Sequence, residues 1–167
     1  MVNSEISLNR LKQFGPKAYI HLDRLYHNYS EIQNHAKSCE IMSIVKTNAY
    51  GHGAVLISKA LAKFGCKWFG VFTYEEGIEL RNGGIKQNIF VLSKMNIESI
   101  ESAIEFKFSL NLSSWEDFAL LKNYYQKYKV LPKVHIKIDT GMSRLGFDFS
   151  DVEKVLDTLF SNCLYTA

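Results

Sequence analysis

The chain has 167 residues, of which 47% are hydrophobic and 22% are charged, and its net charge is +3. A chain of this length and composition can bury the core of one globular domain, which excludes a disordered protein. The lysines are scattered and no apolar run approaches the roughly 18 residues of a membrane span, so we expect neither a nucleic-acid partner nor a membrane segment.

The N-terminal residues and the cysteines indicate where the protein works. Residues 1–14 lack the apolar core of a signal peptide. The three cysteines are far apart and have no metal-ligand spacing, so the sequence predicts neither a disulfide framework nor a metal site. We therefore expect a cytoplasmic protein. Residues 1–17 are interpreted as a polar lead-in ending near Gly15-Pro16, and residues 18–167 as the domain.

Short apolar segments alternate with amphipathic ones along the domain, which predicts strands and helices in turn. The predicted strands are residues 18–22, 41–45, 68–72, 89–92, 108–112 and 134–138, and residues 164–166 would open another. The predicted helices are residues 24–39, 55–65, 75–81, 97–106, 115–128 and 152–160. The predicted helix caps are Asp23, Ser113 or Ser114, and Ser150.

Strands and helices that alternate in this way are typical of a parallel α/β sheet covered by helices. Two architectures fit, an open doubly wound sheet and a (β/α)8 barrel of the TIM type. A barrel needs eight strands and typically about 250 residues, whereas only about six strand–helix units are recognisable here. If the fold is a barrel, we expect the chain to be an incomplete one.

Lys46 directly follows the predicted strand 41–45 and begins a polar, glycine-rich turn. In either architecture, functional sites lie at the carboxyl ends of the strands. A lysine amine that is desolvated there can attack a carbonyl and form a Schiff base. Tyr50 offers a hydroxyl for a phosphate or another polar group, and Gly51 and Gly53 would let the backbone approach a ligand. The alternative is a surface lysine before an ordinary turn.

A second polar segment follows the strand 134–138. Strand alternation would place Lys137 on the same side as His135 and Asp139. Arg144, beyond a glycine turn, is suited to binding a substrate carboxylate. The alternative is a solvated edge strand with a capped turn.

Four further polar residues lie at the same rim of the sheet but give a weaker signal. Asn111 falls at the end of its predicted strand, and Tyr74, Glu75 and Glu76 come soon after theirs. Acidic residues in the first turn of a helix stabilise it, which accounts for both glutamates without a functional role.

The two polar segments resemble the signatures of alanine racemase, a fold-type III enzyme that depends on pyridoxal 5'-phosphate (PLP). VKTNAYGHG at residues 45–53 is similar to the cofactor-lysine signature of that family, and KIDTGMSRLGF at residues 137–147 is similar to its second signature. AYIHLDRLYHNY at residues 18–29 resembles the first strand and helix of the family. The resemblance covers most of the chain and implies the N-terminal part of a TIM-type barrel.

By this resemblance, Lys46 would carry PLP as a Schiff base and would also act as the base that moves the α-proton on one face of the substrate. Tyr50 would bind the cofactor phosphate, and Arg144 would lie near the substrate carboxylate. Lys137 matches a lysine that is carbamylated in many family members. The implied reaction is the interconversion of L-alanine and D-alanine for peptidoglycan synthesis, catalysed by a homodimer.

The later parts of the family are not matched, including the C-terminal β-domain that supplies the opposite catalytic tyrosine. Racemisation needs a base on each face of the substrate, so we expect the chain by itself to be inactive. Two alternatives remain: a single-domain PLP-binding protein that regulates cofactor supply, and a non-catalytic remnant of the barrel.

Overall fold

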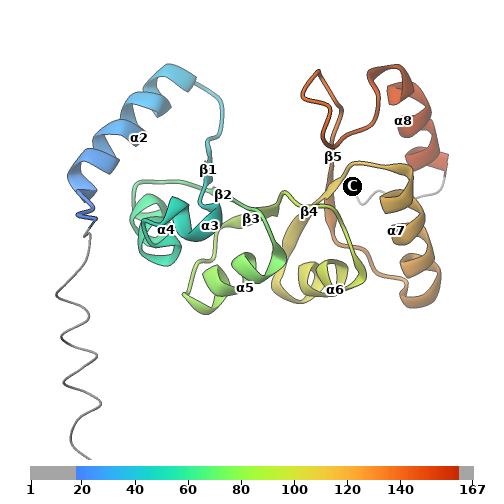
Figure 1. Ribbon diagram of the computed structural model, residues 1–167, viewed down its shortest axis with the longest axis horizontal. Coiled ribbons are helices and arrows are strands. Elements are labelled where there is room, and N and C mark those ends of the chain that lie inside the picture. The colour runs from blue at the N-terminus through green and yellow to red at the C-terminus, as the bar shows by residue number, and fades with distance from the viewer. Residues whose placement is uncertain (1–17, 162–167) are drawn as a thin grey trace, which may run out of the picture.

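The computed structural model describes residues 18–161, and a five-stranded parallel sheet forms its centre (Figure 1). The strands lie side by side in the order in which they occur along the chain. They are β1 Met42–Ile44, β2 Trp68–Val71, β3 Asn88–Val91, β4 Phe108–Leu112 and β5 Lys133–Ile136. Each of these five matches a predicted strand to within two residues at either end.

Helices form the connections between the strands. α4 (Ala54–Lys63), α5 (Tyr74–Asn82), α6 (Ile97–Phe106) and α7 (Trp115–Tyr128) follow β1, β2, β3 and β4 respectively. α2 (Leu22–Ala36) precedes β1, the short α3 (Lys46–Tyr50) follows it, and a 3-10 turn (Phe149–Asp151) leads into α8 (Val152–Ser161). None of the helices within residues 18–161 is long and apolar enough to cross a membrane.

The two faces of the sheet differ in burial. Phe69, Ile89 and Phe108 stand in register on one face and are at most 1% exposed. Helices cover this face, since Gly77 of α5 packs directly against the Phe108 ring. A doubly wound sheet would carry helices on both faces, whereas a barrel carries them only on its outer face.

The other face of the sheet is strongly concave. Trp68 of β2 and His135 of β5 are three strands apart, yet their ring centroids lie only 5.6 Å from each other. Neighbouring strands are spaced by about 4.8 Å, so a flat sheet would separate these positions by about 14 Å. The curvature and the one-sided helix layer identify the described strands as part of a TIM-type barrel rather than an open sheet.

Three sequence predictions about the ends of elements were wrong. Residues 18–21 form no strand, because no strand within the described residues lies beside them to accept their hydrogen bonds. α2 begins at Leu22, which places Asp23 in the first turn rather than at the cap. Asp148, and not Ser150, caps the turn before α8, and its carboxylate accepts the Ser150 N–H at 2.8 Å.

The cap of α7 was predicted correctly as one of two serines. Ser114 Oγ accepts the Asp117 N–H at 3.2 Å. The predicted lead-in at residues 1–17 and the predicted strand at residues 164–166 lie outside the described residues.

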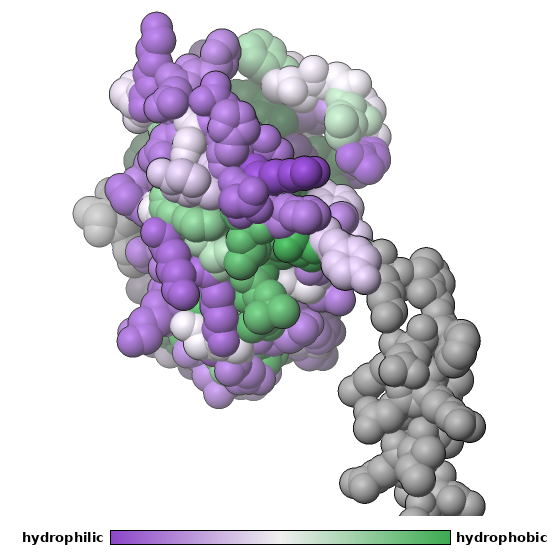
Figure 2. Space-filling view, turned by 90° about the vertical axis from the view of Figure 1, so that its left-hand side faces the viewer, coloured by the Kyte–Doolittle hydropathy of each residue, from purple (hydrophilic) through white to green (hydrophobic). Residues whose placement is uncertain are grey.

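α2 lies at one end of the molecule and packs on α4 (Figure 1). The Tyr26 and Phe64 rings are in edge contact there, with 4.9 Å between their centroids. Figure 2 looks onto this end of the molecule and shows an apolar surface among polar side chains. A groove between the two helices is lined there by Leu22, Tyr26, Leu56, Ala60 and Phe64, with Asp23, Lys59 and Lys63 beside them. Leu56 is 72% exposed, so this end of the molecule offers apolar surface to the solvent.

Candidate active site

A cavity of about 670 Å³ opens where the five strands end at their carboxyl termini. This is the position expected for an active site in a barrel of this type, and the volume suits a small molecule. The cavity is lined by Lys46, Phe72, Phe90, Leu92, Asn111, His135, Ile136, Lys137, Ile138, Met142, Arg144 and Leu145. All five strands, or the residues directly after them, therefore contribute to one site.

Three of the four site residues predicted from the sequence, Lys46, Lys137 and Arg144, line this cavity together. No carboxylate is found among the described residues that line it. The arrangement favours a ligand with negative charge. Tyr50, the fourth predicted residue, is 60% exposed at the end of α3 and does not line the cavity.

The segment after Lys46 is a left-handed turn. Thr47, Asn48, Ala49 and Tyr50 have φ angles of 54°, 53°, 52° and 54°. For residues other than glycine this conformation costs roughly 1–2 kcal/mol each, so the turn costs about 4–8 kcal/mol in backbone energy. Strain of this size persists where the surrounding structure holds it, and it is found mostly at functional sites.

Hydrogen bonds within the turn offset part of this strain. The Ala49 N–H donates to Val45 O at 2.8 Å, and Asn48 Oδ1 accepts the first amide of α4, from Ala54, at 2.8 Å. The amides of Gly51, His52 and Gly53 all donate to backbone carbonyls of the turn. The amides of Gly51 and Gly53 are thus bonded within the turn, and the approach of this backbone to a ligand stays a prediction.

Lys46 lies beside an aromatic ring that the sequence analysis did not single out. Its Nζ is 5.9 Å from the centroid of Phe72, the residue directly after β2, at the outer limit of a cation–π contact. The ring closes one side of the cavity next to the amine. The sequence contained the signal for this position, because Phe72 follows Trp68 and Gly70 in strand alternation and so belongs to the concave face.

Asn111 and His135 are register partners on the concave face of β4 and β5. Asn111 is 2% exposed, and its Oδ1 has no hydrogen-bond donor among the described residues, although its Nδ2 donates to Leu92 O at 3.4 Å. His135 packs against Phe90 at 4.7 Å between ring centroids, and burial lowers its pKa. A buried acceptor without a donor, facing a cavity, indicates a place for a ligand donor or a water molecule.

The second polar segment closes into a loop beside this cavity. Asp139 Oδ1 accepts the N–H groups of Gly141 at 3.0 Å and Ser143 at 2.9 Å, and these bonds lower the pKa of the Asp139 carboxyl. β5 ends at Ile136, before Asp139, and the Asp139 carboxylate folds back into the loop. That Asp139 lies on the same side as Lys137 stays a prediction.

The loop returns to the sheet at Phe147, whose N–H donates to Lys137 O at 2.9 Å. Gly146 permits this return, because its φ is 123° and a Cβ there would lie 2.6 Å from Asp139 N. The tip of the loop then presents Arg144 and Met142 to the cavity, with Arg144 Nη2 2.8 Å from Met142 Sδ.

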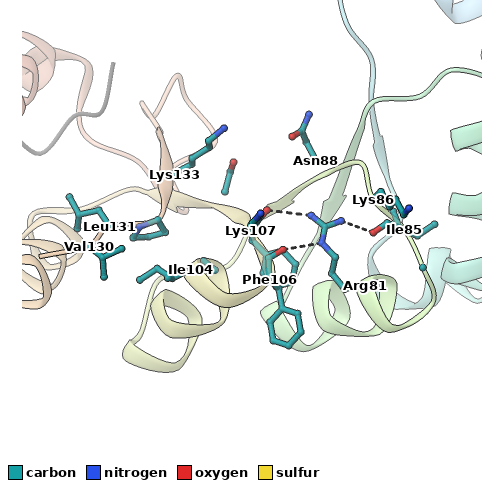
Figure 3. A pocket seen from close by; sticks show the side chains of 15 residues that line it. Arg81, Ile85, Lys86, Asn88, Ile104, Phe106, Lys107, Val130, Leu131 and Lys133 are labelled. Carbon is teal, nitrogen blue, oxygen red and sulfur yellow. Dashed lines mark hydrogen bonds between the residues drawn. The ribbon is translucent and has the colours of Figure 1, made fainter. Parts of the chain in front are cut away.

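A second cavity, of about 690 Å³, lies at the opposite, amino-terminal ends of β3, β4 and β5 (Figure 3). Its most buried cation, Arg81, points toward the backbone and donates to the carbonyls of Ile85, Phe106 and Lys107, as well as to that of Gln87. Its guanidinium is thus engaged by the protein itself. We therefore take the cavity around Lys46 as the candidate active site.

Comparisons with known proteins show which family the chain is similar to. The family described as alanine racemase, N-terminal domain, matches residues 20–164. Among curated proteins, the alanine racemase of Carboxydothermus hydrogenoformans is 35% identical over 142 residues, covering 85% of this chain and 39% of that protein.

Solved structures of racemases also superpose on the chain. The alanine racemase of Acinetobacter baumannii has a TM-score of 0.76 and 33% identity, covering 86% of this chain and 43% of that one. The histidine racemase of Leuconostoc mesenteroides has a TM-score of 0.76 and 26% identity, covering 84% of this chain and 38% of that one. The chain thus spans about two fifths of the length of the relatives that it matches. On this evidence, the chain belongs to the alanine racemase N-terminal domain family.

Proposed function

We propose that the chain forms the lysine-bearing part of a PLP-dependent amino-acid racemase. One observation carries the proposal: Lys46, Lys137 and Arg144, which are far apart in the sequence, line a single cavity at the carboxyl ends of the strands.

The cavity suits PLP in charge, shape and polarity. Its cationic lining complements a phosphate, and the rings of Phe72 and Phe90 offer apolar walls for a flat heterocycle. The unpaired Oδ1 of Asn111 can accept a hydrogen bond from a bound group. When bound, PLP supplies an electron sink for the negative charge left on the substrate Cα after proton removal.

In the proposed mechanism, the protein positions the substrate and moves one proton. The Lys46 amine holds the cofactor and takes the α-proton from one face of the substrate. Arg144 binds the substrate carboxylate, because a guanidinium can donate two parallel hydrogen bonds to it. The Tyr50 hydroxyl is the proposed donor to the cofactor phosphate; its side chain is exposed beside the cavity lining rather than part of it, so it would turn toward the bound group.

The proposed substrate is alanine, with D-alanine destined for peptidoglycan. The relatives named above include racemases of alanine and of histidine, so the family accommodates side chains of different size. In this chain Phe72, Leu92 and Leu145 line the cavity, and an apolar wall favours a small apolar side chain.

Lys137 is proposed to be carbamylated. It lines the same cavity as the Arg144 guanidinium, and two cations there would repel each other. Addition of CO₂ to the Lys137 amine releases a proton and leaves an anion that can pair with Arg144. Incubation with ¹³C-labelled bicarbonate should give a carbamate carbon signal that Lys137→Ala removes and Lys133→Ala keeps.

The main experiment is PLP capture. We expect the chain to give PLP the visible absorbance of a lysine-bound cofactor, and borohydride reduction followed by peptide mapping to locate the label at Lys46. Lys46→Ala should abolish both signals, whereas Lys59→Ala, which changes an exposed lysine of α4, should keep them. Labelling spread over several surface lysines in the folded protein would contradict the proposal.

A polypeptide of these 167 residues alone is proposed to lack racemase turnover. Proton removal and delivery on opposite faces require two bases, and only Lys46 is assigned as a base within the described residues. A coupled assay for D-alanine should therefore stay at the level of free PLP even when the cofactor is captured. Turnover close to that of a full-length alanine racemase would refute this part of the proposal.

A further inference from the structure

Glu76, in the first turn of α5, makes contacts that exceed those of a helix cap. Its Oε1 accepts the Thr47 N–H at 2.7 Å, and its Oε2 accepts the Phe72 N–H at 2.7 Å. The capping bond itself, from the Thr73 N–H to Oε2, is the longest of the three at 3.4 Å. The two short bonds join backbone groups that are not part of α5.

These two backbone groups belong to residues that neighbour Lys46, one in the sequence and one in space. Thr47 is the residue directly after Lys46 and the first residue of the left-handed turn. Phe72 carries the ring that lies 5.9 Å from Lys46 Nζ. One carboxylate therefore fixes both the backbone from which the lysine projects and the residue whose ring stands beside its amine.

The left-handed turn needs such an anchor. The later amides find acceptors nearby in the sequence: Ala49 donates to the Val45 carbonyl, and Gly51 and Gly53 donate to carbonyls of the turn itself. The Thr47 amide instead finds its acceptor in Glu76, which is 29 residues away in the sequence. A bond between a carboxylate and a backbone amide is charge-assisted and correspondingly strong.

We propose that Glu76 is a positioning residue for Lys46: it ties the left-handed turn after β1 to the end of β2 and so sets where the lysine amine lies in the cavity. This inference rests on the proposed function for the role of Lys46 in cofactor capture. The link between the turn and Phe72 can be tested without any cofactor.

The test compares Glu76→Ala and Glu76→Gln with Glu75→Gln. The Glu76→Gln variant keeps one acceptor oxygen and replaces the other by a donor. Its rates of amide exchange, methylation and PLP capture should therefore lie between those of wild type and Glu76→Ala. Glu75→Gln is the matched control, because it removes the same charge from the same helix turn. The Glu75 carboxylate bonds to the Thr73 side chain and has no bond to Thr47 or Phe72 among those described.

Three measurements are made on each variant. Amide hydrogen exchange of peptides containing Thr47 and Phe72 should become about 10- to 100-fold faster in Glu76→Ala, as expected for the loss of a charge-assisted hydrogen bond. Reductive methylation of Lys46 with formaldehyde should become faster, because the amine is less shielded. PLP capture at Lys46 should become about tenfold slower, because the amine is no longer held in place.

The opposite directions of the last two measurements separate positioning from general loss of structure. Global loosening would also speed methylation of half-buried Lys122 on α7 and exchange in peptides of β3 and β4. The proposal is wrong, and Glu76 is only a helix cap, if Glu76→Ala leaves amide hydrogen exchange at Thr47 unchanged. The same conclusion follows if amide exchange becomes faster while the rate of PLP capture stays that of wild type.

The outcome for wild type distinguishes the two proposals. If wild type captures no PLP at Lys46, the proposed function fails. The positioning of Lys46 by Glu76 is then decided by hydrogen exchange and by the methylation rate of Lys46: unchanged values in Glu76→Ala overturn it.

Discussion

Replacing Arg81 tests how the amino-terminal side of the sheet is held together. Arg81, in the last turn of α5, donates to four carbonyls: from Nε to Phe106 at 2.9 Å, from Nη1 to Ile85 and Gln87 at 2.7 Å each, and from Nη2 to Lys107 at 3.3 Å. Burial also lowers its pKa. One side chain thus fastens the end of α5 to the connections that enter β3 and β4.

The expected loss of stability in Arg81→Ala follows from these bonds. Hydrogen bonds from a charged group contribute roughly 1.5–3 kcal/mol each when buried, and the half-buried setting of Arg81 places each of the three short ones near the lower limit. We therefore expect a loss of about 3–5 kcal/mol in the free energy of unfolding. With a urea m value of about 2 kcal/mol/M, the midpoint should fall by about 1.5–2.5 M.

Urea unfolding followed by far-UV circular dichroism measures this change. Arg81→Lys should retain less than half of the stabilisation, because one ammonium cannot reach carbonyls spread around a planar guanidinium. The control is Lys86→Ala, an exposed cation lining the same cavity, with an expected change below about 0.5 kcal/mol. A loss below about 1 kcal/mol in Arg81→Ala would show that water satisfies these carbonyls equally well and would refute the reasoning.

Three further predictions concern packing, pH and assembly. Gly77→Ala places a Cβ 2.9 Å from the buried Phe108 ring. Although alanine favours the helix, this clash should lower the free energy of unfolding in urea by about 1–2 kcal/mol, and an unchanged or higher midpoint would contradict this. The pKa of Asp139 lies below its ordinary range, so its stabilisation of the loop is present above that range and is lost as the pH falls through the folded-state pKa. The protection factor of the Gly141 amide, which corrects for the intrinsic pH dependence of exchange, should drop there in wild type; a similar drop in Asp139→Ala would argue against the assignment. Within the described residues, β1 and β5 each have one unpaired edge, so sedimentation velocity should detect self-association that grows with concentration, and a monomer at all concentrations would speak against open edges.

The five strands could be predicted because each is a short apolar run that ends in a glycine, a polar residue or a helix cap. Lys46, Lys137 and Arg144 could be placed at one rim because parallel strands all end on the same side of a sheet. The segment at residues 18–22 was mistaken for a strand, since alternation indicates which residues could form one but not whether a partner strand lies beside them.

The parts of the site that escaped prediction depend on partners distant in the sequence. Nothing in the local sequence TNAY, which has no glycine, indicates four left-handed residues in succession. Glu76 resembles any first-turn acid until its bond to Thr47 is known. The sequence placed Asn111 at the rim of the sheet but gave no sign that it would be buried beside a cavity with its Oδ1 lacking a donor among the described residues.

The identity between strand order in the sheet and strand order in the chain also bears on how the molecule folds. Among the five strands of residues 18–161, each pairs only with the strands immediately before and after it in the sequence, so none of these pairings has to wait for a distant part of the chain. The sheet can therefore grow one strand–helix unit at a time while the polypeptide leaves the ribosome, in the manner of a repeat protein. By the same logic, order should be lost from the two edges inward, and the central strand β3 should be the last to open in the folded state.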